Sequence, residues 1–96
     1  MSESVPSPIL TLFRRDGCHL CDQARLTLQG VLEERAAAGL RLAQVRERDI
    51  TDDPDTERRY LETIPVLQLG DRELPLAISG RRIREFLADT LDRSLV

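Results

Sequence analysis

The stretch Ile9-Leu10-Thr11-Leu12-Phe13-Arg14-Arg15-Asp16-Gly17-Cys18-His19-Leu20-Cys21 joins an apolar run to a pair of cysteines. Residues 9–13 barely alternate between apolar and polar, which predicts a central strand covered on both faces. Residues 14–17 then turn the chain. Beyond them, apolar residues recur at helical spacing, and this stripe consists of Leu20, Ala24, Leu28 and Val31. The cysteine pair is therefore expected where a strand turns into a helix.

The spacing of the two cysteines favours redox chemistry. On a helix, Cys18 and Cys21 lie on one face about one turn apart, so they can form a disulfide. Unpaired N–H groups and the positive end of the helix macrodipole would stabilise a thiolate at Cys18. We therefore predict Cys18 as the nucleophile and Cys21 as the resolving thiol. The alternatives are two inert core thiols, or half of a zinc site that His19 would complete only to three ligands, fewer than the four that structural zinc requires.

The remaining elements are predicted from periodicity and punctuation. The first helix ends near Gly39. Residues 40–45 begin a second strand, and the charged run 46–48 that follows suits a strand at a sheet edge. Asp53-Pro54 starts a short helix that ends at about residue 62. Residues 66–69 and 73–78 form a hairpin, whose second strand Pro75 makes an edge or a kinked strand. A last helix carries the stripe of Ile83, Phe86, Leu87 and Leu91.

This order of elements, βαβαββα, defines the expected fold class. The first crossover requires a parallel strand pair and the hairpin an antiparallel one. We expect an α/β domain with a mixed four-stranded sheet flanked by three helices. Its size fits a single domain, residues 9–96, preceded by a flexible tail of residues 1–8 that is rich in proline and serine.

Composition excludes several classes of function. The net charge is -3 and aromatic residues make up 3% of the chain, which argues against a nucleic-acid-binding surface. No apolar stretch approaches the ~20 residues that span a bilayer, and the first residues lack the features of a signal peptide. We therefore expect a cytoplasmic protein without a membrane partner. Structural disulfides are disfavoured in the cytoplasm, so the cysteine pair is expected to be catalytic.

The sequence resembles the glutaredoxin-like proteins of the thioredoxin superfamily over residues 9–92. Three features carry the resemblance: the cysteine pair after the first strand, the segment Thr63-Ile64-Pro65 before the third, and the absence of an extra N-terminal strand. In glutaredoxins a similar Thr-Val-Pro segment holds a cis proline beside the cysteines. The resemblance therefore implies a thioredoxin-like fold with a cis Ile64-Pro65 bond, which would leave the Ile64 backbone free to pair with an extended substrate.

The resemblance also implies an activity. A glutaredoxin-like thiol-disulfide oxidoreductase would reduce or exchange protein or low-molecular-weight disulfides through Cys18 and Cys21, as a monomer with no bound cofactor. Its reductant would be glutathione or a thioredoxin reductase. A redox-sensing or partner-binding module without turnover is the alternative, and an iron-sulfur cluster bridging two chains is a third reading.

The resemblance to glutaredoxins also predicts which residues around the cysteines bind substrate. Arg15 occupies the basic position three residues before the nucleophile, and His19 directly follows it. Where glutaredoxins carry Pro-Tyr between the cysteines this chain has His19-Leu20, and their Gly-Gly-Asp segment appears only as Ser79-Gly80-Arg81-Arg82. Glutathione use therefore stays open. The full set of predicted substrate-binding residues is Arg15, His19, Thr63, Ile64, Pro65, Gly80 and Arg81. The simpler alternative is that His19 is an exposed spacer and that the arginines are solvated surface charges.

Overall fold

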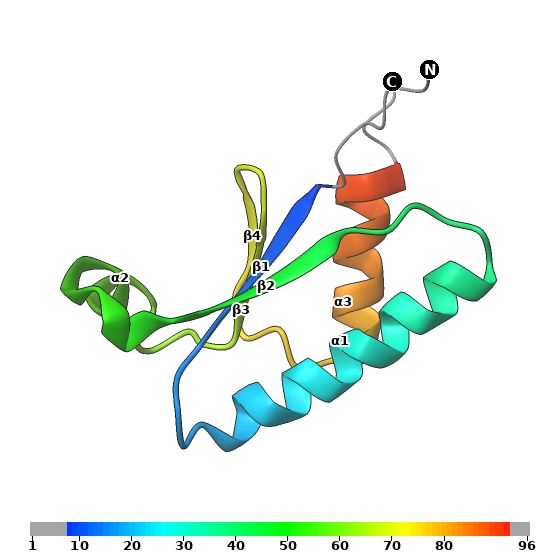
Figure 1. Cartoon of the computed structure of the whole chain (residues 1–96). Helices are drawn as coiled ribbons and strands as arrows, with labels where there is room; N and C mark the ends of the chain where they lie inside the picture. Colours follow the sequence, from blue (N-terminus) through cyan, green and yellow to red (C-terminus); the bar gives the residue numbers. More distant parts are fainter. Residues whose placement is uncertain (1–7, 93–96) are drawn as a thin grey trace.

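The computed structural model describes residues 8–92, and it has the predicted order of strands and helices (Figure 1). The strands are β1 (Ile9–Arg14), β2 (Gln44–Asp49), β3 (Val66–Leu69) and β4 (Arg72–Leu74). The helices are α1 (His19–Ala37), α2 (Pro54–Tyr60) and α3 (Gly80–Leu87). A 3-10 turn, Ile50–Asp52, precedes α2, and a π-helical segment, Ala88–Asp92, continues α3. Most of the predicted tail lies outside the described residues, but the Pro8 carbonyl accepts the Gln44 N–H at 2.8 Å.

The four strands form one mixed sheet in the order β2-β1-β3-β4. β1 pairs with β2 in parallel and with β3 antiparallel, and β3 and β4 form the antiparallel hairpin. The predicted position of the second strand at an edge of the sheet is confirmed. The fold class is the predicted one, a mixed four-stranded sheet with three helices.

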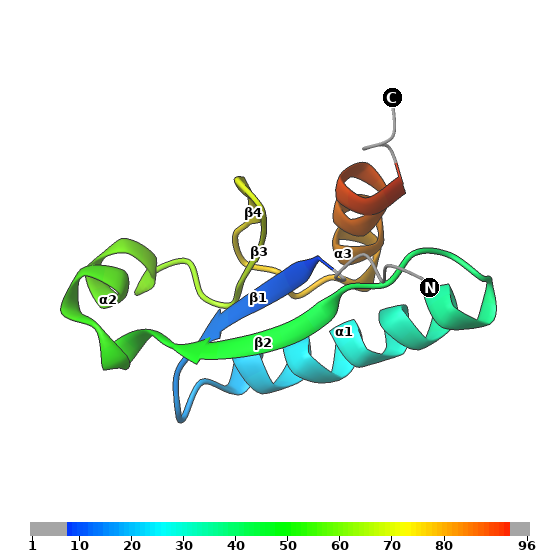
Figure 2. The same ribbon diagram turned by 45° about the horizontal axis from the view of Figure 1, so that its top comes forward.

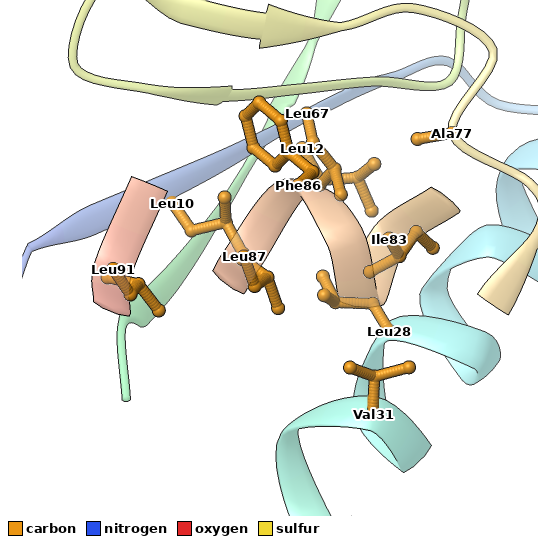
Figure 3. Close-up of a cluster of buried hydrophobic side chains, with 10 residues drawn as sticks. All are labelled: Leu10, Leu12, Leu28, Val31, Leu67, Ala77, Ile83, Phe86, Leu87 and Leu91. Carbon is orange, nitrogen blue, oxygen red and sulfur yellow. The ribbon is translucent and has the colours of Figure 1, made fainter. Parts of the chain in front are cut away.

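One face of the sheet carries the main hydrophobic core, which α1 and α3 cover together. Leu10 and Leu12 of β1 meet Leu28 of α1 and Ile83 of α3 there (Figure 3). The cluster comprises Leu10, Leu12, Leu28, Val31, Leu67, Ala77, Ile83, Phe86, Leu87 and Leu91. The two helices are tied further by an ion pair between Glu34 and Arg84. This packing fixes the direction of α1, and with it the position of the cysteines at its start.

A second cluster lies at the end of the sheet where β1 stops. It comprises Phe13, Cys21, Ile50, Tyr60, Ile64 and Val66, with Cys18 packed against it. Tyr60, the last residue of α2, stacks on Phe13 with ring centroids 4.4 Å apart. Figures 1 and 2 place α2 at this end, away from α1 and α3. Full coverage of β1 on both faces is therefore wrong, since Ile9 is exposed and Thr11 half-buried.

Some predicted boundaries are wrong. The second strand begins at Gln44 and not at residue 40, so it consists mainly of the charged run and its neighbours, while Leu40 and Leu42 are exposed in the preceding loop. Glu47 is held by Arg25 of α1 at 2.7 Å, and Asp49 lies 3.4 Å from Arg14, so cross-element ion pairs accommodate a charged edge strand.

The fourth strand is also shorter than predicted. It ends at Leu74 because Pro75 has no N–H to donate and Leu76 has a positive φ of 51°. The second helix ends at Tyr60, two residues before the predicted boundary, and begins as predicted with Asp53 as its N-cap. Over the described residues, no helix has the length and apolar character needed to cross a membrane.

Candidate redox site

Cys18 caps the N-terminus of α1. Its backbone is extended, with φ -92° and ψ 104°, and its Sγ accepts the backbone N–H of Cys21 at 3.1 Å. Gly17, with φ +77°, provides the left-handed conformation that the turn into the helix requires. The sulfur thus occupies the place of a capping oxygen, where free N–H groups and the macrodipole favour negative charge. The predicted position of Cys18 at the helix start is confirmed.

The two cysteines form a disulfide, with their Cα atoms 5.2 Å apart. Cys18 is half-buried, whereas Cys21 is fully buried in the second cluster. Leu20, predicted to belong to the buried stripe of the helix, is instead exposed, and Cys21 takes its place. Only the first cysteine of the pair is therefore partly exposed.

The cis-proline loop packs on the same cluster. The Ile64-Pro65 bond is cis, as the resemblance implied, and both residues are buried. Ile64 shares the second cluster with Cys21, so the loop and the disulfide lie together. The expectation of a free Ile64 backbone is wrong for its N–H, which donates to the Tyr60 carbonyl at 3.0 Å. Thr63 is half-buried and donates its N–H to the same carbonyl at 2.9 Å.

Tyr60 connects this cluster to the sheet. Its hydroxyl donates a hydrogen bond to the Glu73 carboxylate at 2.5 Å. Burial raises the pKa of Tyr60, and Glu73 raises the pKa further. The phenol therefore stays protonated and anchors the floor of the site. Sequence reasoning missed this contact because the two residues are 13 positions apart and carry no shared motif.

The loop between β4 and α3 lies directly against the cis-proline loop. The Leu76 N–H donates to the Thr63 carbonyl at 2.9 Å, and the Ala77 N–H donates to the Pro65 carbonyl at 2.7 Å. The guanidinium of Arg82 donates to the carbonyls of both Leu76, at 3.1 Å, and Pro75, at 3.3 Å. Arg82 thus holds the loop, a role that sequence reasoning also missed.

Four of the predicted site residues, all within the described part of the chain, form no hydrogen bond or ion pair with either cysteine. Arg15 is exposed in the turn before Cys18, and His19 is exposed as the first residue of α1. Gly80 begins α3 and lies next to α1, where an added Cβ would meet Thr27 at 3.4 Å, an ordinary van der Waals distance. Arg81 is exposed and lies 3.4 Å from Glu85. The structure thus brings together Cys18, Cys21 and Thr63-Ile64-Pro65, while a substrate-binding role for the other four residues stays a prediction.

Among residues 8–92 the structure shows no group of three or more His, Cys, Asp or Glu side chains that could hold a metal ion. His19 is exposed beside the cysteine pair, and Cys21 is buried.

A cysteine pair at the start of the first helix, a neighbouring cis proline and this sheet order together define a glutaredoxin-like member of the thioredoxin superfamily. The comparison with protein families agrees, since the Glutaredoxin-like domain (DUF836) matches residues 9–94. The chain belongs to this family. No curated protein matches it.

Solved structures share the fold. A crystal structure of the X. campestris target protein XcR50 is 36% identical, covers 83% of this chain and 96% of its own, and has a TM-score of 0.65. The solution structure of the same target also matches, with 36% identity and a TM-score of 0.64, over 83% of this chain and 92% of its own. Protein Ne2328 from Nitrosomonas europaea is 22% identical, with a TM-score of 0.65 over 90% of this chain and 98% of its own, and shows likeness of fold alone.

Proposed function

We propose that this protein is a thiol-disulfide oxidoreductase that cycles between the Cys18/Cys21 dithiol and the disulfide. The observation that carries the proposal is the difference between the two cysteines: Cys18 caps a helix and is partly exposed, whereas Cys21 is fully buried. A nucleophile must be ionised and accessible. A resolving thiol needs only to reach its partner, which the disulfide demonstrates.

The reaction balances over two exchange steps. The Cys18 thiolate attacks one sulfur of a substrate disulfide, forming a mixed disulfide and releasing the other sulfur as a thiolate. Cys21, as its thiolate, then attacks the Cys18 sulfur and releases the remaining substrate thiolate, which takes up a proton. The substrate gains two electrons and the protein disulfide forms. Two thiols from a reductant, glutathione or the dithiol of a reductase, return the protein to its starting state.

The helix cap lowers the barrier to this chemistry. The N–H of Cys21 already points at the Cys18 sulfur in the disulfide, at 3.1 Å. The same N–H would donate to a Cys18 thiolate in the reduced protein, where a charged acceptor makes a stronger hydrogen bond than a neutral one. Cys18 would therefore be both a better nucleophile near neutral pH and a better leaving group than an unperturbed thiol.

Single cysteine variants test this division of labour. The reduced protein is mixed with 5,5'-dithiobis(2-nitrobenzoate), which releases a coloured thiolate on attack. Wild type should release two equivalents and end as the internal disulfide. Cys21→Ser should release one equivalent rapidly and retain a mixed disulfide at Cys18, whereas Cys18→Ser should react slowly at the buried Cys21. Rapid reaction of Cys18→Ser would refute the assignment.

A redox-sensing or partner-binding module without turnover is the second candidate, because the same disulfide could form without a dedicated reductant. Multiple turnovers of a disulfide substrate with glutathione or a thioredoxin reductase would exclude it. A single oxidation that changes affinity for a partner, with no sustained turnover, would favour it. The cytoplasm remains our proposed location, since a reducing compartment would keep the dithiol available.

A further inference from the structure

The loop between β4 and α3 holds a leucine in an unusual backbone conformation. Leu76 has a φ of 51°, in the left-handed region that bulky residues rarely enter and that glycine or asparagine adopts more readily. The other positive φ angles in the described chain, residues 8–92, belong to Gly17, Gly39 and Gly70. A side chain kept at such a position points to a use for that side chain.

The backbone N–H and carbonyl of Leu76 both form hydrogen bonds within the protein. The N–H of Leu76 is donated to Thr63, and its carbonyl accepts from both the Ile78 N–H, at 2.8 Å, and the Arg82 guanidinium. The neighbouring Pro75 carbonyl also accepts from Arg82. What this residue offers to solvent is therefore hydrocarbon, and the Leu76 side chain is 45% exposed.

The position of Leu76 links it to the redox site. Thr63, its backbone partner, directly precedes Ile64, which packs in the second cluster with Cys21. Leu20, two residues beyond Cys18, is 44% exposed on the first turn of α1. Leu76 is thus tied to the cis-proline loop that packs with the disulfide, while the Arg82 guanidinium is engaged by the loop itself.

We propose that Leu76 is a specificity-determining residue that contacts an apolar side chain next to the reacting cysteine of a polypeptide disulfide. This inference rests on the proposed function and names its substrate class. In the exchange step, the Cys18 thiolate bonds to one substrate sulfur and the other sulfur leaves as a thiolate. Burial of the exposed part of Leu76 against the substrate stabilises this encounter, so polypeptides with apolar flanks react faster than polar ones.

The test compares Leu76→Asn with Leu40→Asn in the Cys21→Ser background, which retains the mixed disulfide. Leu40 is a matched control, because it is 47% exposed and follows α1 at the end opposite Cys18. Two synthetic peptide disulfides serve as probes, one with leucines flanking the cysteine and one with serines. The measured quantity is the rate constant of mixed-disulfide formation, together with the melting temperature of each variant.

Leu76→Asn should slow the reaction with the leucine-flanked peptide about fivefold, from loss of roughly half a leucine's contact area. The rate constant with the serine-flanked peptide should stay unchanged. The melting temperature should stay unchanged or rise, since asparagine tolerates the left-handed conformation. Leu40→Asn should change neither rate. Leu76→Gly repeats the test if the asparagine variant fails to fold.

Other outcomes overturn the inference in distinguishable ways. Equal rates for Leu76→Asn and its parent with the leucine-flanked peptide would show that the side chain makes no substrate contact. An equal loss with both peptides would assign Leu76 a structural role in the loop. If the parent forms no mixed disulfide with either peptide, the proposed function fails and this inference fails with it.

Discussion

Two ion pairs join α1 to the C-terminal helical segment, and they should differ sharply in their contribution to stability. Arg35 donates to Asp92 at 2.6 and 3.3 Å, and Arg84 donates to Glu34 at 2.9 and 3.2 Å. Both ion pairs are bidentate. The Arg35 side chain is only 7% exposed, however, whereas both partners of the second pair are more than half exposed. Burial, and not geometry, should therefore decide the outcome.

Asp92→Ala is the informative perturbation because it leaves the Arg35 guanidinium buried without its counter-ion. Breaking a buried pair in this way costs about 3–5 kcal/mol. Because Asp92 is 32% exposed and Arg35 keeps its hydrogen bond to the Arg41 carbonyl, we discount this to about 2–3 kcal/mol. For a domain of this size the melting temperature should fall by about 10–20 °C.

Thermal unfolding followed by circular dichroism at pH 7 measures this difference. Glu34→Ala is the matched control and should leave the melting temperature unchanged, since water replaces the lost partner of Arg84. The double variant Arg35→Met/Asp92→Ala should recover part of the loss, because it removes the unpaired buried charge. Equal effects of Asp92→Ala and Glu34→Ala would refute the reasoning.

The same pair predicts a pH dependence. The hydrogen bonds from Arg35 lower the pKa of Asp92. A carboxyl with a lowered folded pKa stabilises the protein fully above its unfolded pKa of about 3.9 and loses this contribution as the pH falls through the folded pKa. The difference in melting temperature between wild type and Asp92→Ala should therefore shrink as the pH falls below about 3.9.

Three further predictions follow from single side chains. Gly30→Ala should stabilise the protein by about 1 kcal/mol, because no atom lies within 4 Å of the added Cβ in the middle of α1; an unchanged denaturation midpoint would contradict this. Tyr60→Phe should cost about 1 kcal/mol through loss of the bond to Glu73, and the single tyrosine of wild type should ionise above about pH 10 in an ultraviolet titration; ionisation at or below that pH would contradict the buried contact. His19→Pro should raise the pKa of Cys18, measured by thiolate absorbance in the reduced protein, whereas identical values would remove His19 from the mechanism.

The spacing of apolar residues, together with the glycine, proline and capping residues, was enough to predict the order of the elements and most of their positions. Asp53-Pro54 starts α2 and Gly39 follows α1 because capping and positive φ are local requirements that single residues satisfy. The position of Cys18 at the helix start was predictable for the same reason. Its disulfide with Cys21 follows from the spacing alone.

The errors have in common a dependence on partners distant in sequence. The helical spacing predicts Leu20 as a member of the buried stripe, but Cys21 fits the spacing to Ala24 equally well. Only the contact of Cys21 with the second cluster decides between the two residues. The charged strand β2 depends on Arg25, 22 residues before Glu47. Its boundary could not be read from the local pattern, which favoured the apolar residues just before it.

The loop beside the redox site shows the same limit most clearly. Nothing in Leu74-Pro75-Leu76 indicates a leucine with positive φ, because glycine is the usual signal for that conformation. The conformation depends on Thr63 and Arg82, which reach the loop only in the folded chain. No local pattern around Arg82 indicates that its guanidinium binds the backbone carbonyls of Leu76 and Pro75.

Alkylation of the reduced protein as a function of pH tests the central claim most directly. After reduction, iodoacetamide is added in pulses and each cysteine is quantified by peptide mass spectrometry. The account predicts that Cys18 is modified with an apparent pKa below the usual value of about 8.5, while Cys21 stays protected until the protein unfolds. Preferential modification of Cys21, or reaction of Cys18 no faster than free cysteine at neutral pH, would contradict it.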